Sequence, residues 1–222
     1  MDHGQEMKMI VNLPEPVFWL WLSGAVFIIM ALVLLIGPYN KERNELMTAF
    51  LGFLIGMGLF HILGGASMLW GKISLMYLAA FAAVTGSAFV LKFPLTAIGE
   101  GARRTIFYIA MLAGWVMIIS MILLNSTMDL VMRNAAIYMI IVSGAISGFY
   151  MVAQGFRIND PSVKLKCIGG GCSIIFCCLL THLIVILIGM TALAKLFMVL
   201  TPITLVLSVV MARRIARTST TA

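Results

Sequence analysis

The placement of charge along the chain constrains its fold more than any other feature. Seven long apolar runs contain no Asp, Glu, Lys or Arg, and every charged residue lies between or beyond them. A helix needs about 20 apolar residues to cross the hydrocarbon core of a bilayer. We therefore predict seven transmembrane helices over residues 17–37, 46–70, 73–91, 105–124, 135–154, 167–190 and 196–212.

The composition excludes the main soluble classes. Of the 222 residues, 62% are hydrophobic and only 10% are charged, whereas soluble domains have roughly 45–50% apolar and about 25% charged residues. A soluble enzyme, a nucleic-acid-binding domain and a disordered chain are therefore all excluded, despite the net charge of +7. The sequence predicts an all-α integral membrane protein with a seven-helix bundle.

The basic residues predict the orientation of this bundle. Eleven Lys and Arg residues lie in the odd-numbered loops and the C-terminal tail, and four lie on the other side. By the positive-inside rule, residues 1–16 form an external segment and residues 213–222 a basic cytoplasmic tail. We expect a multi-pass protein of the plasma (inner) membrane, with anionic lipid as a partner at its cytoplasmic rim.

Spacing along the sequence favours an internal repeat. Seven helices can divide into two triplets of the same orientation joined by one linker helix, a 3+1+3 parallel repeat. His61 and His182 lie 121 residues apart, in the second and sixth predicted spans. Ser23 and Ser143 lie 120 residues apart, in the first and fifth.

Glycines mark the predicted helix contacts. Gly52 and Gly56 form a GxxxG pattern in the second span, and Gly144 and Gly148 form another in the fifth. Small residues at this spacing let helix backbones approach closely within a bilayer. The consecutive glycines at 169–171 predict a weakened, unwound beginning of the sixth span.

His61 and His182 are the only histidines within the predicted spans, and they are the candidate cofactor-binding residues. Each lies about 22–24 Å from the cytoplasmic edge, at the helical rise of about 1.5 Å per residue. Polar groups at such depth normally face the bundle interior or a cavity. Two imidazoles at one height could ligate a haem b iron, flank a solute or proton path, or only hydrogen-bond neighbouring helices.

A copper site is a further alternative. Met57 precedes His61 by four residues, and Cys178 precedes His182 by four. Each helix would then offer one soft ligand and one imidazole, a set that suits Cu(I). The N-terminal segment adds His3 and three methionines, which could also bind copper.

These features predict a non-enzymatic protein that binds or transports a small solute or ion, or is an integral subunit of a membrane complex. A b-type cytochrome or copper-handling protein with His61 and His182 as ligands is the alternative. A membrane sensor or receptor acting through a partner protein is the third. No retinal is expected, since the last span, 196–212, contains no lysine for a Schiff base.

Overall fold

The computed structural model describes residues 14–41, 44–92, 94, 100–124 and 129–220. The His3 cluster proposed for copper and most of the external segment lie outside these ranges. The described chain is helical throughout, apart from short connections. The helical elements are α2 (Glu15–Leu34), η1 (Leu35–Tyr39), α3 (Glu45–Trp70), α4 (Ile73–Leu91), α5 (Glu100–Leu124), α6 (Asp129–Arg157), α7 (Pro161–Ile174), η3 (Ile175–Thr181), α8 (His182–Ile188) and α9 (Ala192–Thr220).

Six of the described helical segments are long and apolar enough to cross a membrane. They are Glu15–Tyr39, Glu45–Trp70, Ile73–Leu91, Tyr138–Arg157, Pro161–Ile188 and Ala192–Arg217. Large apolar side chains cover their outer surface: Leu187 is 77% exposed, Ile188 is 72% exposed and Ile36 is 71% exposed. Soluble monomers rarely expose so much apolar surface. The all-α, multi-pass membrane architecture predicted from the sequence is therefore confirmed.

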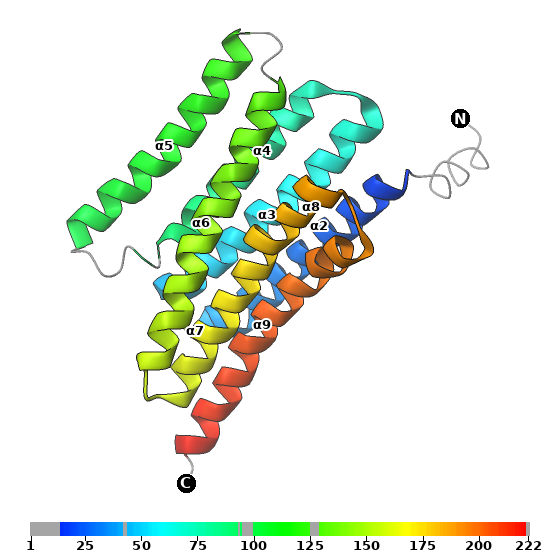
Figure 1. Cartoon of the computed structure of the whole chain (residues 1–222). Coiled ribbons are helices and arrows are strands. Elements are labelled where there is room, and N and C mark those ends of the chain that lie inside the picture. Colours follow the sequence, from blue (N-terminus) through cyan, green and yellow to red (C-terminus); the bar gives the residue numbers. More distant parts are fainter. Residues whose placement is uncertain (1–13, 42–43, 93, 95–99, 125–128, 221–222) are drawn as a thin grey trace.

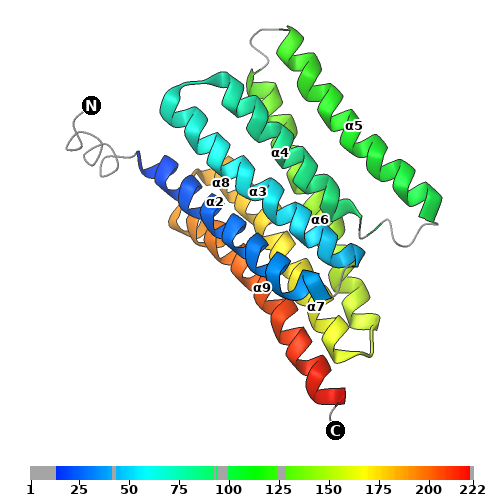
Figure 2. The same cartoon turned by 180° about the vertical axis from the view of Figure 1, so that it is seen from behind.

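The helices form one bundle with α5 at its outer edge (Figures 1 and 2). Contacts connect α2 with α3, α3 with α4, α4 with α6, α6 with α7, α7 with α9, and α9 with α2. These contacts close a ring of six, against which α5 packs through α4 and α6. The buried core of the ring contains Phe27, Phe50, Phe53, Ile140 and Leu205.

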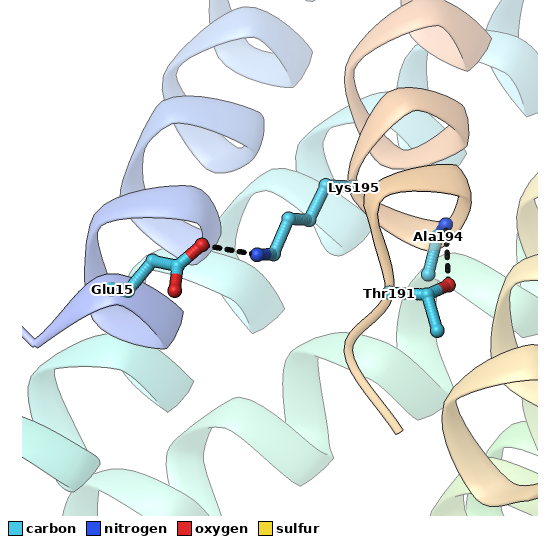
Figure 3. A network of polar contacts seen from close by, with 4 residues as sticks. All are labelled: Glu15, Thr191, Ala194 and Lys195. Carbon is cyan, nitrogen blue, oxygen red and sulfur yellow. Dashed lines mark hydrogen bonds and ion pairs between the residues drawn. The ribbon is translucent and has the colours of Figure 1, made fainter. Parts of the chain in front are cut away.

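The first and last described helices, α2 and α9, run side by side in the same direction. Near their starts, Lys195 of α9 forms an ion pair with Glu15 of α2 (Figure 3). Near their ends, the Arg213 guanidinium donates from Nη1 to the carbonyl oxygen of Gly37 at 3.4 Å. Thr191 Oγ1 caps the start of α9 by accepting from the Ala194 N–H. Polar contacts thus fasten the two helices together at both ends.

The turn between α3 and α4 is as tight as the sequence predicts. Asn44 caps the start of helix α3, where its side chain accepts from the Met47 N–H at 2.9 Å. The helix ends at Gly71, whose φ of +63° lies in the left-handed region that favours glycine. The Ser67 hydroxyl donates to the Lys72 carbonyl at 3.0 Å and holds this turn closed.

The structure corrects one expectation about local helix geometry. Gly169–Gly171 do not unwind their helix, because α7 is regular through this stretch. The glycines let neighbouring elements approach: a Cβ on Gly170 would lie 2.4 Å from the Phe50 ring, and one on Gly171 would lie 2.7 Å from the Gly148 carbonyl oxygen. The residues after Ala212 continue α9 to Thr220, so this part of the predicted tail is helical.

Within the described helices, three irregularities interrupt the regular α-helical hydrogen bonding. The π-helix η1 ends the first helix and contains Pro38. The π-helix η3 joins α7 to α8, immediately before His182. Pro202 lies inside α9. A proline removes the N–H that would bond to the carbonyl four residues earlier. In a π-helix each N–H bonds to the carbonyl five residues earlier instead of four, so residues five apart lie on the same face. Two of these irregularities adjoin the candidate site.

A pH-dependent helix cap begins α7, outside the membrane-spanning segments. The Ser162 hydroxyl and the Val163 and Ser162 N–H groups donate to the Asp160 carboxylate and lower the pKa of Asp160 below its ordinary value. A lowered pKa means that the cap is complete above the ordinary value of about 3.9 and is lost as the pH falls through the lowered one.

We expect Ser162→Ala to raise the pKa of Asp160 toward its ordinary value, measured from the carboxyl ¹³C signals of labelled aspartate in micelles. An unchanged midpoint would contradict this assignment, and Ser147→Ala, at a distant buried serine, is the control.

Candidate functional site

The two membrane histidines line one cavity in the interior of the bundle. Its volume is about 100 Å³, and His61 of α3 and His182 of α8 lie on its wall. The two residues are only 2% and 8% exposed. The other described lining residues are Leu20, Phe60, Cys177, Thr181, Val185, Met190 and Met198. We call this the histidine cavity.

A three-helix hydrogen-bond chain holds His61. Its Nδ1 lies 2.9 Å from Ser23 Oγ of α2, and the same hydroxyl donates to the Met198 carbonyl of α9 at 3.1 Å. Met198 lies four residues before Pro202, whose missing N–H leaves this carbonyl without its regular helical donor. Ser23 supplies the donor that Pro202 lacks, and so it connects the proline irregularity to the imidazole.

His182 is held from within its own helix. Its Nδ1 lies 2.9 Å from the carbonyl oxygen of Cys177, five residues earlier. A spacing of five residues matches the hydrogen-bond register of the π-helix η3, which ends immediately before His182. The irregular turn therefore sets the orientation of this second imidazole.

These contacts assign the same neutral tautomer to both rings. A carbonyl oxygen only accepts, so His182 carries its proton on Nδ1 and donates it to Cys177. Ser23 uses its one proton on Met198, so its oxygen accepts from the Nδ1–H of His61. Each Nε2 then carries a lone pair, and neither Nε2 has a hydrogen-bond partner among the described residues. The histidine cavity is therefore bordered by two imidazole acceptors.

The Phe60 ring contacts both imidazoles. Its ring centroid is 5.3 Å from that of His61 and 6.4 Å from that of His182, where the rings are stacked. Because both distances share the Phe60 ring, the imidazole centroids are less than about 12 Å apart. The cavity of about 100 Å³ is much smaller than the roughly 300–1,000 Å³ of small-molecule and cofactor sites. A porphyrin does not fit between these rings.

Only two of the four predicted copper ligands are among the described lining residues of the histidine cavity. His61 and His182 share the cavity, but Met57 and Cys178 lie in the buried core and are not among its described lining residues. Cys177 lines it instead, because the π-helix brings residues five apart, rather than four, onto one face. Within the described ranges, no group of three or more His, Cys, Asp or Glu side chains is placed to hold a metal ion.

The glycines predicted at helix contacts lie in close packing. A Cβ on Gly56 of α3 would lie 2.5 Å from Gly86 Cα of α4, and one on Gly144 of α6 would lie 2.0 Å from Cys178 Cβ. A Cβ on Gly52 would meet the Phe89 ring at 2.3 Å, and one on Gly148 would meet Ile175 at 2.5 Å. These contacts bring α3 against α4, and α6 against the helix that carries His182.

Comparison with known proteins assigns no family. No protein-family model, curated protein or solved structure matches the chain. The function must therefore be argued from the site itself.

Sequence analysis missed several residues that organise the site. Ser23 was noted only as part of the repeat, and Met198 not at all. Trp21 of α2 donates from Nε1 to the Ile62 carbonyl of α3 at 3.2 Å. Pro202 was the available signal, since a proline within a predicted span frees the carbonyl four residues earlier and calls for a donor from another helix.

Proposed function

We propose that this protein binds and transports a small, hydrogen-bond-donating solute or ion through the histidine cavity. The observation that carries the proposal is the shared cavity of His61 and His182, each with its Nδ1 proton committed elsewhere and its Nε2 lone pair without a partner among the described residues. Polar groups that face a cavity within a membrane bundle commonly mark solute or ion pathways.

The cavity favours a solute of only a few heavy atoms. A cavity of about 150 Å³ holds benzene, and the volume here is about 100 Å³. The hydroxyl proton of Thr181 is donated to the Phe176 carbonyl, so it is not available to the cavity. Imidazole nitrogens that only accept favour donors such as ammonium, small amines or urea.

The path of the chain supports seven spans. Helices α2 and α9 run in the same direction, because their starts are joined by Glu15 and Lys195 and their ends by Gly37 and Arg213. Two parallel end helices require an odd number of crossings. The six apolar helices become an odd number if α5 also crosses, and α5 lies along the edge of the bundle (Figure 1). With the charge asymmetry, this supports an external N-terminus and a cytoplasmic C-terminus.

The helix contacts also support the 3+1+3 parallel repeat. The order α2–α3–α4 corresponds to α6–α7/α8–α9, with α5 as the linker. In each triplet the first helix contacts the second and the second contacts the third, and α4 contacts α6 as α9 contacts α2. His61 and His182 then occupy equivalent second helices and face one cavity at the junction of the repeats. Parallel-repeat transporters commonly bind substrate at such a junction.

Substitution by asparagine isolates the role of Nε2. The amide nitrogen of Asn can replace the Nδ1 donor toward Ser23 or Cys177, but Asn has no atom at the Nε2 position. We expect proteoliposomes of the full-length protein to take up radiolabelled methylammonium or urea faster than protein-free liposomes. His61→Asn and His182→Asn should each slow the uptake at least about tenfold, as expected for loss of an acceptor worth 1.4 kcal/mol or more.

Ser147→Ala is the matched control. Ser147 is a buried serine of α6 that does not line the histidine cavity, and its hydroxyl has no hydrogen-bond partner within the described chain. Uptake should be unchanged in this variant. The proposal fails if neither solute enters faster with the wild-type protein, or if both Asn variants transport at the wild-type rate.

Copper binding is the second candidate. It is favoured by the two Nδ1 donations, because metal-bound imidazoles commonly donate their other ring N–H to a carbonyl. Met190 and Met198 line the same cavity, and their thioethers suit Cu(I). Copper bound in equal amount to the protein, and lost in both Asn variants, would support this function. A metal-free protein after incubation with Cu(I) would exclude it.

A further inference from the structure

A second cavity lies at the other end of the bundle, between the end of the first helix and the end of the last. It has a volume of about 260 Å³ and is lined by Gly37 and Pro38 of η1 and by the last turns of α9. Contacts between η1 and α9 bring these segments together (Figure 2). We call it the arginine pocket, since Arg213, Arg214 and Arg217 all line it.

The charged residues among the described lining of this pocket are all arginines. The hydrogen bond from Arg213 to the Gly37 carbonyl anchors one guanidinium across the pocket. Guanidinium groups bind phosphate oxygens in bidentate pairs, with better geometry than a lysine can provide.

The local shape of η1 contributes the remaining wall. Pro38 lies inside this π-helical turn, where it offers no N–H. A Cβ built on Gly37 would have no other atom within 4 Å, so the space beside this turn is open. A favourable helix dipole accounts for basic residues at the end of α9, but it does not require a cavity beside them.

The pocket also has an apolar side, which distinguishes a lipid from a soluble anion. Val33 and Val210 also line it, and Val33 is 43% exposed on the surface of the bundle. The lining therefore combines apolar side chains with basic residues, the combination that a lipid headgroup and the first carbons of its acyl chain require. Basic pockets between transmembrane helices on the cytoplasmic side can bind anionic lipid headgroups.

We infer that the arginine pocket binds the phosphate headgroup of one anionic phospholipid, with the first part of an acyl chain against Val33 and Val210. The site is separate from the histidine cavity and does not depend on the function proposed for it. The lipid would join the ends of α2 and α9 at the face that the charge asymmetry predicts to be cytoplasmic.

The test measures lipid retention by native mass spectrometry of the full-length protein, titrated with phosphatidylglycerol or phosphatidylcholine. We expect one phosphatidylglycerol to bind at least about tenfold more tightly than phosphatidylcholine, a preference set by the interfacial basic residues. Exchange of Arg213, Arg214 and Arg217 to Gln together should remove this preference. Arg214→Gln alone, which leaves the Arg213–Gly37 bond in place, should weaken it and provides a readout if the triple variant does not fold.

A second triple variant removes equal charge at the same end of the bundle. Lys41 follows η1, and Arg157 and Lys164 flank the α6–α7 connection, which lies at the same end as the C-terminus (Figure 1). Exchange of these three residues to Gln should preserve the tight site. Equal loss in both triple variants would show a diffuse charge effect and overturn the inference. Competition by millimolar inorganic phosphate as effective as that by phosphatidylglycerol would assign the pocket to a soluble anion and overturn it as well.

Discussion

Gly56→Ala is expected to destabilise the bundle by about 3 kcal/mol, the upper part of the range for overpacked cores. The new Cβ would lie 2.5 Å from Gly86 Cα and 2.8 Å from the Ala82 carbonyl oxygen. Both are backbone atoms of α4, so no side chain can rotate away and the two helices must separate. The measurement is unfolding of the purified protein by SDS titration from mild detergent, followed by far-ultraviolet circular dichroism.

Gly64→Ala is the matched control on the same helix. A Cβ at Gly64 has no other atom within 4 Å, and alanine is favoured over glycine in a helix by about 1 kcal/mol. This variant should be as stable as the wild type or slightly more so. Equal destabilisation by both substitutions would mean that the α3–α4 contact is not the cause.

Ser23→Ala is expected to cost about 1–3 kcal/mol and to change the tautomer of His61. The substitution removes the shared partner of the Met198 carbonyl and the His61 Nδ1–H. The His61 proton can move to Nε2, so the cost is that of one buried unpaired group, the Met198 carbonyl. Without Ser23, no contact in the described structure holds the proton on Nδ1. The ¹⁵N signals of the His61 ring should therefore change from one protonated Nδ1 to a mixture of the two neutral tautomers.

His182 provides the internal reference for this experiment. Its Nδ1 donates to a backbone carbonyl of its own helix, so its ¹⁵N signals should not change in Ser23→Ala. Ser147→Ala should leave both histidines unaltered and the stability equal to or above that of the wild type, because its hydroxyl lacks a partner in the described chain. An unchanged His61 spectrum in Ser23→Ala would contradict the proposed proton arrangement.

The sequence predicts the helices well because the energetic signal is strong. A charge within the bilayer is so costly that charged residues accumulate where helices end, and the described helices Glu45–Trp70 and Ile73–Leu91 fall where uncharged runs occur. The weaker local signals mislead. Three glycines lower helix propensity at 169–171, but packing against neighbouring helices outweighs that preference.

The site could be predicted only in part. His61 and His182 attract attention because titratable groups are rare within apolar spans. The residues around the two histidines depend on backbone irregularities, which composition does not reveal. Because of the π-helix η3, Cys177 rather than Cys178 lines the cavity. Because Pro202 has no N–H, the Met198 carbonyl accepts from Ser23 instead. The four-residue spacing used to choose Met57 and Cys178 assumes a regular α-helix, and near His182 that assumption fails.

The link between Ser23 and Met198 has a consequence for biogenesis. These residues are 175 positions apart, so the ribosome delivers the first helix to the membrane long before the acceptor for its serine exists. A nascent chain without α9 holds Ser23 and His61 in lipid with their network incomplete. The hydrogen bond from Ser23 to the Met198 carbonyl therefore forms among the last steps of assembly. An insertase or a quality-control protease could distinguish finished from unfinished chains by whether this polar network is complete.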